Sequence, residues 1–284
     1  MIEPRHQQLG QFALAHKPDP AVVRAKQKQI FDATLALSRR MDGPNFTRIG
    51  PDDLQRMAIQ YDQLFFDSQL VGGARREGIR FGWSSRMTRN AGKTVTHYTG
   101  SRHSQGALAK GTRGTAARNA ADGSPEGRGK GTRNFEIILS STLLFQTFAD
   151  VKRPVEVTGI VCRNRLEAMQ RIVEHELVHL LEMLVWDDSS CSQRRFHGIA
   201  QRFFGHREHR HDLITQAERA ATKFQLKPGS RVRFRFEGQV LTGHINRITR
   251  RATVLVADPH GERFSDGHRY RRYYVPLEQL VPVK

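Results

Sequence analysis

The sequence LEAMQRIVEHELVHLLEMLV, which runs from Leu166 to Val185, decides how the fold is interpreted. It is the strongest helical signal in the chain, because helix-forming residues fill it and its apolar side chains recur at helical spacing. Within it stands the motif His175-Glu-x-x-His179. Two histidines four positions apart on a helix project from the same face, so both imidazoles reach one metal ion.

The motif predicts a zinc site with hydrolytic chemistry. His175 and His179 would hold Zn2+, and Glu176 beside them would act as general base toward water. A chance match is the alternative in a chain with 13 histidines. Its surroundings argue against chance, because a polar cluster inside such an apolar helix costs desolvation free energy unless a partner such as a metal compensates it.

A third protein ligand is expected downstream of the motif. The pattern with Gly and His at fixed offsets is excluded, since Glu182 and Val185 occupy those positions. A carboxylate ligand is also disfavoured, because no acid stands between Asp188 and Arg207. We therefore favour His197, on a predicted helix over Phe196–Phe204. The alternatives, as ligands or as groups that support the ligands and the transition state, are His206, His209 and His211.

The chain before the motif helix predicts an α+β fold. Residues 1–49 are expected to form a loose arm, residues 1–19, followed by a helix over Ala21–Met41. A second helix begins at Pro51 and is expected to end at Gly72-Gly73. Three strands are predicted over Ile79–Trp83, Lys93–Tyr98 and Phe135–Leu139.

Residues 99–134 predict a flexible basic loop between the last two of these strands. The segment is rich in glycine and in cations and poor in apolar residues, so it buries too little surface to order itself. It is either an insertion without a role or an arm that contacts phosphates. In the second case its contacts would include Arg113, Arg118, Arg128 and Lys130.

The C-terminal part predicts a small all-β domain. Residues 215–226 are expected to be a linker, and residues 227–284 show short alternating runs, with turn signals such as Asp258-Pro259 between them, typical of a small barrel. Near its end, arginines alternate with tyrosines, a pattern that suits phosphate contact and base stacking. The alternative places the tyrosines in the core and the arginines on a solvated face. The residues are Arg269, Arg271, Arg272, Tyr270, Tyr273 and Tyr274.

Charge and composition favour a polyanionic partner in a reducing compartment. The net charge is +18 and the isoelectric point is about 10.8, which gives affinity for phosphate backbones almost regardless of sequence. The two cysteines, Cys162 and Cys191, are too few for a disulfide framework or a zinc ribbon and are expected to be inert thiols. No signal peptide or membrane span is recognisable, so we expect a soluble cytoplasmic protein with no membrane partner.

Several blocks together resemble the SprT-like zinc metalloprotease family, to which Spartan-type proteases belong. The similarity covers residues 50–214, approximately, and rests on blocks in the family's order. They are YDQLFFDSQL (Tyr61–Leu70), WSSRMTRNAG (Trp83–Gly92), FEIILSSTLL (Phe135–Leu144), His175-Glu-x-x-His179 and His197-Gly198. The resemblance implies a zincin-like fold, zinc on His175, His179 and His197, and Glu176 as general base. Residues 227–284 resemble an SH3-like or KOW-like module.

The resemblance implies a zinc metallopeptidase that cleaves DNA-bound or DNA-crosslinked proteins, with DNA and protein substrates as partners. Two alternatives stay open. One is a nucleic-acid-binding factor, related to RNA or transcription, whose metal domain is structural or weakly proteolytic. The other is a general peptidase whose charge is incidental. Two features depart from the family: the long basic segment, and the absence of a cysteine-based zinc module after the protease.

Overall fold

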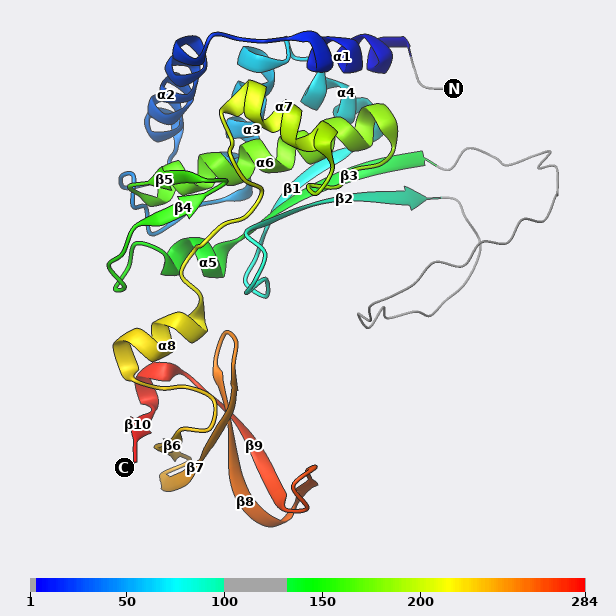
Figure 1. The fold of residues 1–284 in the computed structure, drawn as a ribbon. Helices are drawn as coiled ribbons and strands as arrows, with labels where there is room; N and C mark the ends of the chain where they lie inside the picture. The colour runs from blue at the N-terminus through cyan, green and yellow to red at the C-terminus, as the bar shows by residue number, and fades with distance from the viewer. Residues whose placement is uncertain (1–3, 100–131, 284) are drawn as a thin grey trace, which may run out of the picture.

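The protein folds into two parts that differ in secondary structure. The computed structural model describes residues 4–99 and 132–283. Up to residue 214 helices mix with short strands, and from residue 216 one helix precedes a five-stranded antiparallel sheet. The predicted α+β class is thus confirmed (Figure 1). The elements of the first part are α1 (Pro4–Ala15), α2 (Pro20–Leu37), α3 (Pro51–Phe65), α4 (Leu70–Glu77), β1 (Ile79–Ser84), β2 (Gly92–Thr99), β3 (Thr132–Ser140), α5 (Ser141–Gln146), β4 (Val155–Val157), β5 (Ile160–Cys162), α6 (Arg165–Trp186) and α7 (Arg194–Phe204).

Helix α6, which carries the motif, is the central element of the first part. It begins where the Asn164 side chain accepts a hydrogen bond from the backbone N–H of Glu167 at 2.9 Å. It ends at Asp187, whose backbone is left-handed. Most of its residues are buried, so it is stable only when neighbours surround it. Helices α1, α3, α4 and α7 and strand β2 contact it, and Figure 1 shows it between α7 and strands β1–β3.

The three predicted strands form one sheet in the order β1-β3-β2. Strand β3 is parallel to β1 and antiparallel to β2, so β2 is an edge strand. At the C-terminal end of β2, Thr99 pairs with Thr132 of β3. Beside this pair, Tyr98 Oη and Arg133 Nη1 donate to Asp187 Oδ1 at 2.8 and 3.1 Å. The sheet is therefore anchored to the C-terminal end of α6.

The segment between β2 and β3 falls outside the described residues for the most part. Of the predicted loop 99–134, Thr99 belongs to β2 and residues 132–134 belong to β3. The remainder is not described, which includes Arg113, Arg118, Arg128 and Lys130.

The N-terminal region differs from the prediction in two places. Residues 4–15 form helix α1, which packs on α6; a Cβ on Gly10 would lie 2.7 Å from Val185 Cγ1. The second helix does not run to Gly72-Gly73 but ends at Phe65, because Asp67 and Ser68 adopt positive φ. Both glycines lie inside α4, whose first turn donates to the Asp62 carboxylate. A short polar turn at Asp67 and Ser68 therefore interrupts the predicted helix, and the apolar periodicity on either side of it does not reveal the break.

The C-terminal part holds a separate hydrophobic core. Its sheet has the order β10-β6-β7-β8-β9. The predicted linker is instead helix α8, which begins where Thr215 Oγ1 accepts from the backbone N–H of Glu218. The predicted turn at Asp258-Pro259 lies inside β8, where the pairing with β9 shifts register between Ala257 and Glu262. The elements are α8 (Gln216–Phe224), β6 (Arg231–Phe236), β7 (Gln239–Ile248), β8 (Ala252–Arg263), β9 (Arg269–Val275), the 3-10 helix η1 (Leu277–Gln279) and β10 (Val281–Pro282).

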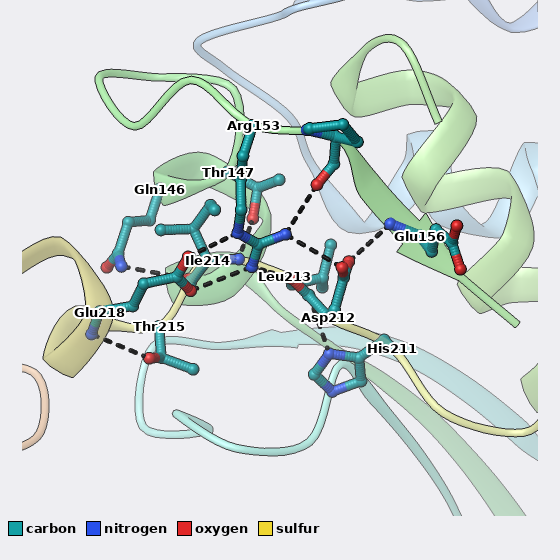
Figure 2. Close-up of polar contacts among 11 residues, drawn as sticks. Gln146, Thr147, Arg153, Glu156, His211, Asp212, Leu213, Ile214, Thr215 and Glu218 are labelled. Carbon is teal, nitrogen blue, oxygen red and sulfur yellow. Dashed lines mark hydrogen bonds and ion pairs between the residues drawn. The ribbon is translucent and has the colours of Figure 1, made fainter. Parts of the chain in front are cut away.

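Ion pairs join the two parts at α8. Arg153 donates to both carboxylate oxygens of Glu218, at 2.5 and 3.0 Å, and to Asp212 Oδ2 at 3.0 Å. Figure 2 shows the Arg153 guanidinium between these two acids. Arg219 in turn binds Asp150 and Glu278, each at 2.7 Å. These contacts fix α8 to the first part.

Membrane insertion finds no support among the described helices, since none is both long and apolar enough to cross a bilayer.

Candidate metal centre

The two histidines of the motif face each other on α6. Their Nε2 atoms lie 3.1 Å apart, and the Phe196 ring packs against both imidazoles with centroids 4.9 and 4.6 Å away. Two nitrogen ligands about 2.0–2.1 Å from a tetrahedral zinc ion lie about 3.3 Å from each other. The spacing of His175 and His179 therefore fits one ion shared between them.

Burial keeps both imidazoles neutral at physiological pH. It lowers the pKa of His175 to about 2, with a smaller contribution from the charge of His179. Burial also lowers the pKa of His179 to about 4. A metal binds only the unprotonated nitrogen, so a neutral pair meets the requirement for coordination without first losing protons.

A third candidate ligand atom comes from Cys191. Its sulfur and the ligand nitrogens of His175 and His179 all lie within 4.8 Å of one another. The left-handed residue Asp187 ends α6 and reverses the chain, which brings Cys191 back to the helix. The expectation of two inert thiols holds for Cys162, which is buried and whose pKa burial raises to about 12. Cys191, by contrast, is half-buried beside the motif histidines.

His197, the predicted third ligand, is not in this group. It follows Phe196 on α7, and Phe196 is the residue that faces the two imidazoles. Successive helical residues point about 100° apart, so His197 points elsewhere and packs against His209 with ring centroids 5.2 Å apart. The helix predicted around His197 is present as α7, but the residue grouped with His175 and His179 is Cys191, from the loop before that helix.

A chain of hydrogen bonds orients His179. Its Nδ1 lies 2.7 Å from Ser189 Oγ, which donates to Glu182 Oε2 at 2.7 Å. Glu182 is fully buried and its other oxygen accepts from Arg195 Nε at 2.6 Å. Metal-binding histidines generally hold their second nitrogen in this way, which fixes the ring and its tautomer. Sequence reasoning missed this chain because Glu182 lies on α6, whereas Ser189 comes from the loop after it and Arg195 from α7.

Glu176 is a buried carboxylate held against strand β2. Thr94 Oγ1 donates to Glu176 Oε2 at 2.7 Å and also contacts the Glu176 carbonyl oxygen at 3.1 Å. A Cβ on Gly92 would lie 2.4 Å from Glu176 Oε1, so only glycine leaves room for this carboxylate. Burial raises the pKa of Glu176 to about 7, although the Thr94 hydrogen bonds lower it in part. A carboxylate with a pKa near neutrality suits a general base.

These groups line one cavity of about 410 Å³. One wall is the edge strand β2 with the residues before it, and the opposite wall includes Val157 and Thr158 at the end of β4. His175, Glu176, His179 and Cys191 are among the lining residues. The cavity therefore brings the candidate metal ligands, a carboxylate and an exposed strand edge together.

The other predicted histidines divide between this cavity and the core. His209 and His211 line the cavity, and His211 Nε2 lies 3.0 Å from the Arg89 carbonyl oxygen. His206 does not approach the metal ligands. It is buried with its Nε2 2.9 Å from Glu174 Oε2, in a network with Arg171 and Tyr61, and its role is to satisfy a core carboxylate.

The arginines predicted to bind nucleic acid in the C-terminal part have partners of their own. Arg271 pairs with Asp258 at 2.8 Å and Arg272 with Glu262 at 2.6 Å, while Arg269 Nη1 donates to the Gly261 carbonyl oxygen. The tyrosines split: Tyr273 packs against Phe234 and Phe236, Tyr270 Oη donates to Asp266, and Tyr274 is 57% exposed.

Strand β6 presents a basic stripe that sequence reasoning overlooked. Arg231, Arg233 and Arg235 are exposed, while Val232 and Phe234 between them are buried. Among the described residues, none of the three arginine side chains has a hydrogen-bond or ion-pair partner. The alternation in RVRFRF already contains this signal, because every second residue of a strand faces the same side.

The chain matches no protein-family model, no curated protein and no solved structure.

Proposed function

We propose that this chain is a zinc-dependent metallopeptidase of the SprT-like type, with a zincin-like fold over residues 50–214. The observation that carries the proposal is the set formed by His175, His179 and Glu176: two neutral imidazoles at ligand spacing, and beside them a buried carboxylate with a pKa of about 7. Zinc, when bound, supplies a Lewis acid that makes water more acidic and polarises a carbonyl.

The residues of the chain supply the proton transfers. The Glu176 carboxylate takes a proton from the attacking water and later delivers it to the leaving amine. Thr94 holds the carboxylate in position through Oε2, while Gly92 leaves space on the side of Oε1. Ser189 and Glu182 keep the His179 ring oriented. Each of these groups is fixed by the fold before substrate arrives, as an efficient site requires.

The edge strand beside the site supports a peptide as substrate. Among the described residues, strand β2 pairs only with β3, and its residues from Gly92 to Thr94 line the cavity. An extended peptide adds to such an edge through backbone hydrogen bonds, which recognise the main chain whatever its side chains. This arrangement suits a protease of low sequence preference.

The charge of the chain supports a nucleic-acid partner, and we propose DNA-bound or DNA-crosslinked proteins as substrates. The β6 stripe provides three free guanidinium groups on one face, in a part that we propose to be an SH3-like barrel. Attachment to DNA would raise the local concentration of protein substrates near the site. It would also make cleavage strongly dependent on salt.

The test is Glu176→Gln in the full chain. We expect the variant to retain bound zinc and DNA affinity, while cleavage of a DNA-bound protein falls by about 10²–10⁴-fold, the usual contribution of a general base. Cleavage would be compared without nucleic acid and with single-stranded DNA, duplex DNA and RNA. Full activity in the variant would refute the role of Glu176, and cleavage that no nucleic acid stimulates would refute the proposed substrate class.

A further inference from the structure

A second, larger cavity is lined by other residues of the β4–β5 hairpin. Its volume is about 630 Å³, and α2, β5, α6 and the end of α7 form its walls. This size is within the range of small-molecule sites. Val157 and Thr158 of the hairpin line the metal cavity, whereas Ile160 and Cys162 line this second one. We call it the basic cavity.

Cations dominate its lining. Six of the lining residues are Arg24, Lys28, Arg163, Arg171, Arg202 and Arg207, against two acids, Asp32 and Glu167. Both acids are already neutralised within their own turns: Lys28 binds Asp32 at 2.6 Å, and Arg163 binds Glu167 at 3.1 Å. Arg171 in turn pairs with Glu174, so Arg24, Arg202 and Arg207 are left to give the cavity its positive potential.

Two arginines of the lining are shielded from solvent to different degrees: Arg171 is buried and Arg202 is half-buried. Arg171 is only 8% exposed, and its Nη1 pairs with Glu174 at 2.9 Å. Arg202 donates through Nη2 to the Ala13 carbonyl oxygen, while its buried Nε has no partner among the described residues. The Arg202 guanidinium has further N–H donors without a partner among the described residues, and these donors suit an anion in the cavity.

The other two arginines are free at the rim. Arg24 and Arg207 are exposed, and neither side chain has a partner among the described residues. They come from α2 and from the segment after α7, so they reach the cavity from different elements. Guanidinium groups converging from several directions suit a phosphate, which accepts hydrogen bonds on three oxygens.

The rest of the lining is largely apolar. Val23, Phe31, Ile160 and Phe204 provide a surface on which a flat ring can pack. A ligand that combines an aromatic ring with a phosphate matches both halves of the lining. We propose that the basic cavity binds a nucleotide through its phosphate, either as a free mononucleotide or as one unit of a nucleic-acid strand. This site requires neither the metal nor proteolysis.

The experiment compares two double variants of the full chain. Arg24→Ala/Arg207→Ala removes the two free rim cations, and Arg75→Ala/Arg80→Ala removes two exposed arginines of α4 and β1 that line neither cavity. Adenosine monophosphate, inorganic phosphate and a single-stranded oligonucleotide are titrated into each protein. We expect the rim variant to bind the nucleotide ligand at least about tenfold more weakly, since charged hydrogen bonds are lost, and the control variant to bind as the wild type does.

The titrated ligands distinguish a site for a free mononucleotide from a site for one unit of a nucleic-acid strand. Weakened binding of adenosine monophosphate identifies a free-nucleotide site. Weakened binding of the oligonucleotide alone identifies a strand unit. Val161→Glu, at a position 56% exposed on β5, adds a negative charge to the lining and should weaken the same ligand. Equal affinities in the rim and control variants, or no saturable binding of either nucleotide ligand, would overturn the proposal. Glu176→Gln should leave all these affinities unchanged, so this outcome is independent of the proposed peptidase activity.

Discussion

The candidate site on α6 and the basic face of the C-terminal sheet have opposite designs. On α6 the polar groups are enclosed and fixed: Glu176 is 3% exposed and Glu182 is 0% exposed, and each has a defined partner. On β6 the arginines stand in solvent without partners. A site such as that on α6 functions only if particular residues keep particular contacts. A basic face such as that on β6 needs only positive charge on one side of the strand.

This difference determines how each region responds to substitution. In the enclosed site one added methyl group meets fixed atoms, so its effect is large and local. On the exposed strand each cation contributes a similar, salt-screened increment, so effects are small and additive. The following substitutions test this contrast, beginning with the largest expected effect.

Gly92→Ala should abolish most peptidase activity without loss of metal. The new methyl carbon would lie 2.4 Å from Glu176 Oε1, so the carboxylate must move. A displacement of about 1 Å at a reacting group costs about a hundredfold in rate. Kinetic assays and zinc content would be measured together.

The matched control is Gly82→Ala in the same sheet, where a Cβ meets no atom within 4 Å. It should retain wild-type activity. Similar losses in the two variants would mean that the sheet, and not the carboxylate, is sensitive.

Cys191→Ser should weaken metal affinity by about ten- to a hundredfold, a loss comparable to that caused by removing a group that supports a metal ligand. His197→Ala should change it less, because His197 packs against His209 and not against the motif histidines. In the cobalt-substituted protein, the absorption band of a thiolate bound to the metal should be present in wild type and in His197→Ala but absent in Cys191→Ser. The reverse order of affinities would restore His197 as the third ligand.

Replacing the three β6 arginines, Arg231, Arg233 and Arg235, by alanine should lower DNA affinity and reduce the salt slope of log K by up to about three. The triple replacement of Arg269, Arg271 and Arg272 is the comparison with the same charge change. It should have a smaller effect, since Arg271 and Arg272 are paired with acids. Equal effects would show that net charge alone governs binding.

The smallest effect on stability is expected when acid weakens the ion pairs between α8 and the first part of the chain. Hydrogen bonds from Arg219 and then Lys223 lower the pKa of Asp150 from 3.8 to about 2. The stabilisation is thus complete above about pH 4 and is lost as the pH falls toward 2. Asp150→Asn should be less stable than wild type at pH 6, by up to about 1 kcal/mol, and the difference in thermal midpoint should disappear near pH 2. A difference that persists there would rule out the ion pairs as its source.

The sequence predicted those features that a local pattern encodes. Helix α6 and the paired orientation of His175 and His179 follow from helical periodicity, and the alternating residues Arg231–Phe236 within the predicted all-β region form β6. The features it missed depend on the path of the chain between elements. Cys191 reaches the pair because Asp187 turns the chain back, and the break at Asp67 and Ser68 depends on two backbone angles. Neither feature changes the spacing of the apolar residues, so periodicity does not reveal it.

The pairing of Thr99 with Thr132 has a consequence for how this chain tolerates change. The strands β2 and β3 are closed in register at this pair, and Tyr98 and Arg133 anchor the same point through Asp187. Whatever connects residues 99 and 132 is attached to a sheet that is already complete. Since the entropy of closing a loop grows only slowly with its length, this position is a natural point for evolution to lengthen or shorten the chain. A reporter domain could also be inserted between these residues without breaking the pairing of β2 with β3.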